Sequence, residues 1–293
     1  MRALYLAAIA LLCAAAPLSA QRKVNEQFAA FPEGHVRVQL LAGSVRVTGW
    51  DHDSIVVRGV VFETGGERFQ LHRDKSGVKL SLWDPLAEKV PPSQLELFVP
   101  ARSHVAIKTA TAAISVTGIT GGVDVGSSTG AIEVSGAPRE LIAESLSGGV
   151  STDVRSRVAR IRTATGSVTM RGAVTDASVV TVSGHVHVET GSIERGRFES
   201  VDGDLRFRGD VAPLASLDFI NHAGAIELML PPSVGAEVSV STFEGTVDNA
   251  LGVNPSRVVS RKGKGMEQTF SLAGGGAYIS IRSFKGNVIL RRK

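Results

Sequence analysis

A short pattern, Gly-x-Val/Ile-x-Val, recurs along the middle of this chain and constrains its fold more than any other feature. Four copies begin at glycines spaced 18 residues apart, namely Gly130, Gly148, Gly166 and Gly184. A copy with alanine in place of glycine begins the same distance upstream, at Ala112. Looser copies begin at Gly203, Gly224, Gly245 and Gly286, and an outlying one at Gly43. A fixed period of this kind indicates a stack of similar structural units.

A second half with the same alternation precedes each glycine. Apolar residues stand seven and five positions upstream, as Val123 and Val125 do before Gly130. Alternation of apolar and polar residues is the period of a strand with one buried face. We therefore predict an all-β fold, a single-stranded parallel β-solenoid (β-helix) with about 18 residues and two strands in each coil. Valine and isoleucine at the inward positions would stack into one continuous core.

A small polar residue stands three positions before the glycine in every copy from Thr109 onward. A hydroxyl or amide at a corner can satisfy backbone groups that the turn leaves unpaired. We therefore expect these residues to form a structural column near the corner of each coil. The column consists of Thr109, Ser127, Ser145, Thr163, Thr181, Ser200, Asn221, Thr242 and Ser283.

The two ends of the chain differ from the repeats. Residues 34–100 contain strand-like runs but lack the 18-residue period, which indicates a separate β module that covers the first coil. At the other end, "QTFSLAGGGAYISIRS" is typical of a hairpin that closes the last coil. The predicted division is a signal peptide at 1–20, an N-terminal β cap module at 21–100, and a β-solenoid domain with a C-terminal hairpin cap at 101–293.

The first twenty residues, "MRALYLAAIALLCAAAPLSA", have the layout of a secretory signal peptide. Arg2 supplies the positive end, a short apolar run follows, and small residues precede the expected cleavage after Ala20. Cys13, the only cysteine of the chain, lies inside the apolar run and would leave with the leader. The mature protein is then expected to have no disulfide and no cysteine-bound metal. We predict an exported protein, periplasmic or at the cell surface.

The balance of charged and aromatic residues bears on the partners. The formal net charge is +4 and aromatic residues make up 5% of the chain. Basic residues are not interleaved with aromatic ones, so we expect no nucleic-acid partner. In an exported protein, a basic balance suits anionic polysaccharide or lipid headgroups better.

Three stretches give the chain a family resemblance. They are "GSVRVTGWD", "LFVPA" followed by "VAIKTATAAISVTGITGGVDVGSSTGAIEVSG", and the late "LAGGGAYISIRSFKGNVIL". Together they resemble the bacterial families called "putative adhesins", exported β-solenoid domains of unknown function similar in style to the head GIN domain. The resemblance covers nearly all of the mature chain. It implies an envelope location and an interaction role, and it supplies no catalytic residues.

One repeat, "VSGHVHVETG", carries the only candidate metal ligands. In the repeat frame Val186 and Val188 point inward, so His185 and His187 point outward. Asp204 occupies the position next to His185 in the following coil, and two histidines with a carboxylate can hold zinc or copper. Arg206 beside His187 opposes a cation there. We predict a solvated strand face, with no metal site and no cofactor, and keep these three residues as candidates.

Basic residues near the C-terminal end are the other candidate site. The loop "RKGKG" holds Arg261, Lys262 and Lys264. A solvated loop is the favoured interpretation, and binding of an anion or contact with a membrane surface is the alternative.

The favoured function is a non-enzymatic, adhesin-like scaffold that binds a glycan or protein partner of the envelope. The first alternative is a carbohydrate-active β-helix enzyme, a lyase or hydrolase, which would need several carboxylates in one cleft. The second alternative is an envelope-stress sensor or regulator.

Overall fold

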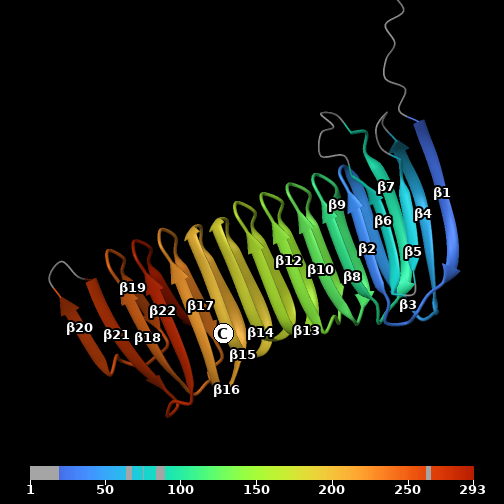
Figure 1. Ribbon diagram of the computed structural model, residues 1–293. Helices are drawn as coiled ribbons and strands as arrows, with labels where there is room; N and C mark the ends of the chain where they lie inside the picture. The colour runs from blue at the N-terminus through green and yellow to red at the C-terminus, as the bar shows by residue number, and fades with distance from the viewer. Residues whose placement is uncertain (1–19, 64–67, 75, 84–89, 262–264) are drawn as a thin grey trace, which may run out of the picture.

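The computed structural model describes residues 20–63, 68–74, 76–83, 90–261 and 265–293. Its regular structure is entirely β, and hydrogen bonds join 23 strands into one sheet along an elongated molecule (Figure 1). The all-β class is therefore confirmed. Within the described residues no helix is long and apolar enough to cross a membrane. All of the predicted signal peptide except Ala20 lies outside the described residues, so it stays a prediction.

Hydrogen bonding arranges the strands in two rows, which we call row A and row B. Inward side chains of both rows form one hydrophobic core. In the N-terminal half, row A consists of β5 (Gln70–Asp74), β6 (Gly77–Leu82), β2 (His35–Leu40), β8 (His104–Thr109), β10 (Gly122–Ser127) and β12 (Glu140–Ser145). Row B consists of β1 (Ala20–Ala29), β4 (Ser54–Glu63), β7 (Ser93–Pro100), β3 (Gly43–Trp50), β9 (Ala113–Ile119) and β11 (Ile132–Gly136).

Four long strands in the middle belong to both rows. Each contributes its first half to row B and its second half to row A, as the pairings of β13 with β11 and with β12 show. Neighbouring strands here are parallel, and their partners are 18 to 21 residues apart in sequence, as for Ala159 with Ala177, Ala177 with Gly196 and Gly196 with Leu217. The four are β13 (Val150–Thr163), β14 (Val168–Ser183), β15 (Val186–Asp202) and β16 (Leu205–Asn221).

The C-terminal strands do not follow chain order. In row A the order is β16, β22 (Ala277–Ser283), β18 (Ala236–Thr242), β21 (Gly265–Leu272) and β20 (Arg257–Arg261). In row B it is β16, β17 (Ile226–Leu230), β23 (Val288–Arg292) and β19 (Val247–Ala250). The last repeat is thus inserted between two earlier ones. The predicted hairpin of β21 with β22 is not formed, because these strands lie on opposite sides of β18; the antiparallel hairpin at this end is β20–β21.

Antiparallel pairs occur at both ends of the sheet, so the sheet is mixed and not uniformly parallel. They join β1 to β4, β4 to β7 and β5 to β6 at the N-terminal end, and β18 to β21 and β21 to β20 at the other. A short returning strand covers edge groups that a stack of parallel strands would leave unpaired. The boundary expected at residue 100 stays a prediction, and strands on either side of it, β2 and β8, pair directly.

The polar column is buried, as the repeat pattern predicts, and most of its side chains bond to backbone groups at the corner; the hydroxyls of Ser145 and Thr181 are buried with no partner among the described residues. Ser127 Oγ accepts from the Gly130 N–H at 2.9 Å, and Thr163 Oγ1 accepts from the Gly166 N–H at 2.8 Å. At other levels the hydroxyl donates, as Ser283 Oγ does to the Gly286 carbonyl at 2.6 Å. The column therefore fixes the corner of successive repeats.

The glycine that follows this column is required by close packing of the backbone. A Cβ at Gly148 would lie 2.1 Å from the Gly130 carbonyl oxygen of the preceding repeat. We expect Gly148→Ala to lower the free energy of unfolding by more than about 2 kcal/mol, because the backbone ladder must separate locally. Gly126→Ala is the control, since a Cβ there meets only the Glu144 carbonyl oxygen at 3.9 Å. Urea unfolding that gives equal losses for the two variants would refute this packing argument.

Candidate functional site

One outward position forms a continuous line along the sheet, immediately after the buried polar column. Backbone hydrogen bonds fix the order of its members. The Thr165 N–H donates to the Leu146 carbonyl at 2.9 Å, the Ala223 N–H to that of Val201 at 2.9 Å, and the Glu244 N–H to that of Phe284 at 2.8 Å. We call this line the apolar strip; its members, in spatial order, are Leu146, Ala164, Val182, Val201, His222, Phe284 and Phe243.

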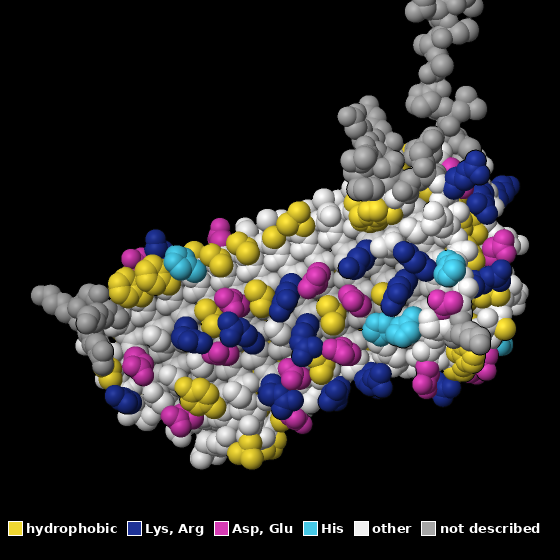
Figure 2. All heavy atoms as spheres, in the orientation of Figure 1, with side chains coloured by type: hydrophobic (Ala, Val, Ile, Leu, Met, Phe, Trp, Pro, Cys, Tyr) yellow, Lys and Arg dark blue, Asp and Glu magenta, His cyan; other side chains and the backbone are white. Residues whose placement is uncertain are grey.

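Large apolar side chains of the strip face solvent. The relative exposures are 61% for Leu146, 54% for Val182, 44% for Val201, 39% for Phe284 and 43% for Phe243. Figure 2 shows hydrophobic side chains, with one histidine among them, aligned along the upper edge of the molecule. With strands about 4.8 Å apart, seven levels extend over about 29 Å. Aligned exposed apolar groups of this kind mark an interaction surface more often than scattered ones do.

The C-terminal half of the strip is an aromatic stack. The rings of Phe243 and Phe284 are parallel within 2° with centroids 4.8 Å apart. His222 stacks on the other face of this pair, 4.8 Å from Phe284 at 19°. Both faces of the Phe284 ring are therefore covered, so Phe284 presents mainly its edge to a partner.

A shallow hollow borders the N-terminal half of the strip. It has a volume of about 890 Å³ and is lined by Leu146, Ala164 and Val182 of the strip, by Trp83 and by the outward residues of β10 and β12. One ion pair, Arg162 with Glu144 at 3.9 Å, lines the hollow. The strip and this hollow together form an apolar surface with a polar margin, as protein interfaces have.

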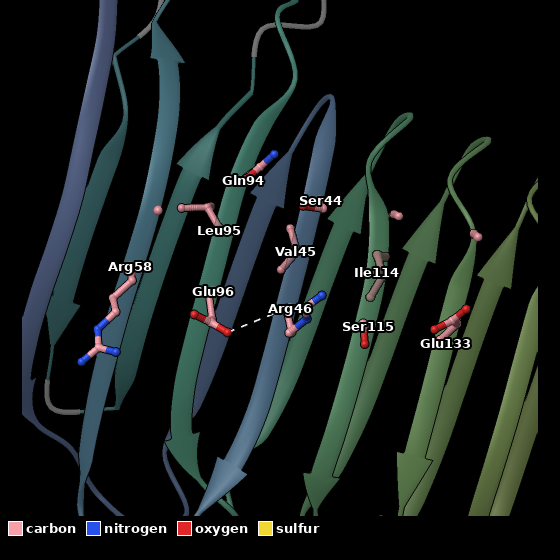
Figure 3. A pocket seen from close by; sticks show the side chains of 13 residues that line it. Ser44, Val45, Arg46, Arg58, Gln94, Leu95, Glu96, Ile114, Ser115 and Glu133 are labelled. Atoms are coloured by element: carbon pink, nitrogen blue, oxygen red, sulfur yellow. Dashed lines mark ion pairs between the residues drawn. The ribbon is translucent and has the colours of Figure 1, made fainter.

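A second hollow of about 570 Å³ lies on row B, over β4, β7, β3, β9 and β11 (Figure 3). Its four charged residues stand in one cross-strand line with a serine between the last two, in the order Arg58, Glu96, Arg46, Ser115 and Glu133. The Arg46 guanidinium is 3.9 Å from the Glu96 carboxylate.

The two carboxylates of this line are too far apart for glycoside hydrolysis. Glu96 and Glu133 are separated by three strand spacings, about 14 Å at 4.8 Å per strand. Paired carboxylates in glycosidases stand about 5 to 9.5 Å apart. Glu96 and Glu133 therefore lack the carboxylate spacing of a glycoside hydrolase.

The histidine pair lies where the repeat frame places it. Val186 and Val188 are buried, His185 is exposed and His187 is partly exposed. The His185 Nδ1 accepts a hydrogen bond from the Asp204 N–H at 3.1 Å, so this nitrogen is engaged by backbone. His187 Nε2 lies 3.7 Å from Glu189 Oε1, and its cross-strand partner is Arg206.

Ligand geometry for a metal is not brought together around these histidines. Asp204 Oδ2 is 3.9 Å from His185 Nδ1 and 3.9 Å from the Arg206 guanidinium, so this carboxylate already forms an ion pair with an arginine. Among the residues that the structure describes, no group of three or more His, Cys, Asp or Glu could hold a metal ion.

The basic candidates at the C-terminal end are described only in part. Lys262 and Lys264 lie outside the described residues, and Arg261 ends β20 with no described side-chain environment. The basic residues of the terminus itself are engaged: Arg291 pairs with Asp248 at 2.8 Å and Lys293 with Asp210 at 3.1 Å. A membrane contact through this end stays a prediction.

Comparison with known proteins finds alignments with solved structures only. The chain matches no protein-family model and no curated protein. Solved structures that align with it include a "putative adhesin" from Parabacteroides merdae, at 7% identity and a TM-score of 0.48 over 92% of this chain and 96% of the other. A "putative lipid binding protein" from Parabacteroides distasonis aligns at 8% identity and 0.47 over 92% and 96%. A "putative adhesin" from Bacteroides fragilis aligns at 9% and 0.45 over 93% and 97%.

Several of these neighbours carry the same name as the families that the sequence motifs resemble. At such identities and TM-scores the alignments transfer no residue and no role.

Proposed function

We propose that this protein is an exported, non-enzymatic β-solenoid scaffold of the cell envelope that binds a partner along the apolar strip. The observation that supports this most directly is that one solvent-facing position is apolar or aromatic at seven successive levels of the stack. Exposing such a line lowers solubility, so a partner that covers it explains why the sequence maintains it.

The character of the strip favours a protein over a glycan as the partner. Sugar rings pack on the open faces of aromatic side chains, whereas Phe284 has both faces covered, by Phe243 and by His222, and each of these two rings has one face covered. Ring edges and the aliphatic Leu146, Val182 and Val201 suit the apolar core of a protein interface. The ion pair of Arg162 with Glu144 beside the strip is part of a polar rim.

A triple variant tests this proposal. We expect Val182→Ser/Val201→Ser/Phe284→Ser to weaken binding of the envelope protein partner at least about tenfold, because three buried apolar contacts are lost. The measurement is retention of solubilised envelope proteins by the immobilised full chain, followed by titration of the retained partner, with a glycan array in parallel.

The matched control removes exposed apolar side chains elsewhere. Leu214 is 83% exposed and Val258 is 53% exposed, and neither belongs to the strip. Leu214→Ser/Val258→Ser should bind as the unaltered protein does. Equal partner affinity of the strip variant and this control would contradict the proposal. Binding to the glycan array that neither variant changes would contradict it as well.

A further inference from the structure

The outer face of row A carries a hollow of about 420 Å³ near its N-terminal end, over β6, β2 and β8. Two histidines lie at its edge, His35 and His104, with ring centroids 5.3 Å apart. Glycines flank this pair on the neighbouring strands. Gly77 is the partner of His35, and a Cβ at Gly122 would lie 2.2 Å from the His104 Nδ1. The glycines thus leave room for the imidazoles and open the surface around them.

Basic side chains surround the hollow. Arg37 and Lys79 face each other across β2 and β6, and Lys108 lines the opposite side. None of the three forms an ion pair within the described part of the chain, although arginines elsewhere on the same row do, as Arg160 does with Glu140 at 2.9 Å. Asp124, at the margin, is the acidic residue that lines this hollow. Figure 2 shows dark blue and cyan side chains gathered over these strands.

The charges in this hollow act on one another. Burial lowers the pKa of the His104 imidazole, and the neighbouring charges of His35 and Arg37 lower it further. Asp124 and Glu140 act in the opposite direction. A bound anion would offset the repulsion among these cations and raise the pKa of His104.

An apolar hollow adjoins the basic one and has the same volume, about 420 Å³. Phe28, Ala30 and Phe31 supply its apolar lining, and Arg73 at its rim lies over the Phe28 ring, 4.7 Å from the centroid. His35 lines both hollows. A cationic site and an apolar site therefore meet at one side chain.

We propose that the two hollows bind one single-chain amphiphile with an oxyanion head, either a carboxylate or a phosphate. The head lies among His35, Arg37 and Lys79, where charge-assisted hydrogen bonds are available. The aliphatic chain lies against Phe28 and Phe31, where its burial is favourable. This site is on the opposite end of the molecule from the aromatic part of the strip, and it does not depend on the proposed function.

Calorimetric titration of the full chain tests the proposal, with probes kept below their micelle concentration. We expect decanoate and decyl phosphate to bind at least about tenfold more tightly than butyrate, which has the head without the chain, and than decanol, which has the chain without the charge. Tighter binding of decanoate indicates a fatty acid and tighter binding of decyl phosphate a phospholipid-derived ligand; both outcomes support the site. An upward shift of the His104 pKa in proton NMR on addition of the bound probe is expected as well.

Charge-neutral variants locate the head. Arg37→Gln/Lys79→Gln should weaken decanoate binding at least about tenfold. Arg155→Gln/Arg157→Gln removes the same charge from an exposed region without described ion pairs and should change nothing, and the strip variant should also bind as before. Equal dissociation constants for butyrate and decanoate, or unchanged binding by Arg37→Gln/Lys79→Gln, would overturn the proposal.

Discussion

Replacing Val168 by aspartate should unfold the middle of the stack. Val168 is 1% exposed in β14, and its neighbours in the ladder are Val150 and Val186, both buried. An aspartate there would place a carboxylate in an apolar core with no partner. We expect the free energy of unfolding to fall by at least about 4 kcal/mol. Thermal melting by circular dichroism measures the loss.

The control for this variant lies one residue earlier. Ser167 is exposed, so Ser167→Asp adds the same charge at the same level of the stack but on the outside. It should melt close to the unaltered protein. Because each repeat contacts only its neighbours, hydrogen exchange in Val168→Asp should rise first in β13, β14 and β15. Equal stability of the two variants would show that the inward and outward positions have been assigned wrongly.

Replacing Phe219 by alanine should be the most damaging truncation in the C-terminal half. Phe219 is 0% exposed and stacks on Phe198 with centroids 5.0 Å apart, while Phe207 meets it edge-on at 5.3 Å. Gly196 and Gly209 make room for this cluster, since a Cβ at either would come within 2.7 Å of a phenylalanine ring. The backbone around the cavity is held by parallel ladders and cannot collapse freely. We expect a loss of about 3–5 kcal/mol in urea unfolding.

Phe284→Ala is the matched control, because it removes the same side chain from the exposed strip. It loses stacking with Phe243 and His222 from a side chain that is already 39% exposed, so the loss should be about 1 kcal/mol. A loss for Phe219→Ala no larger than this would contradict the assignment of the phenylalanine cluster to the core.

The repeats between Ala112 and Gly184 could be predicted closely because alternation and period agree there. The inward places of Val186 and Val188 and the buried polar column follow from that agreement. The position of β22 could not be predicted, since Ile279 and Ile281 have an alternation that fits any gap between parallel strands. Chain order predicts that β22 lies at the end of the stack. The hydrogen bonds place it between β16 and β18.

The pairing of the N-terminal strands could not be predicted either, because a long insertion interrupts the repeat. β3 pairs with β9 although Thr48 and Thr117 are 69 residues apart, because β4 to β7 are inserted between them in sequence. An insertion of that length removes the period. The repeat pattern does not predict the apolar strip. Its position holds the small residues Ala110 and Ser128 in the first repeats and becomes apolar only from Leu146.

In-cell photo-crosslinking tests directly whether the apolar strip binds an envelope protein. A benzophenone amino acid placed at Val182 is compared with one placed at His185, which lies three residues away and faces solvent on another side of the repeat. If the strip binds its partner, we expect a discrete adduct with one envelope protein from position 182 and none from position 185. The same adduct from both positions, or none from either in envelope fractions that contain the protein, would contradict it.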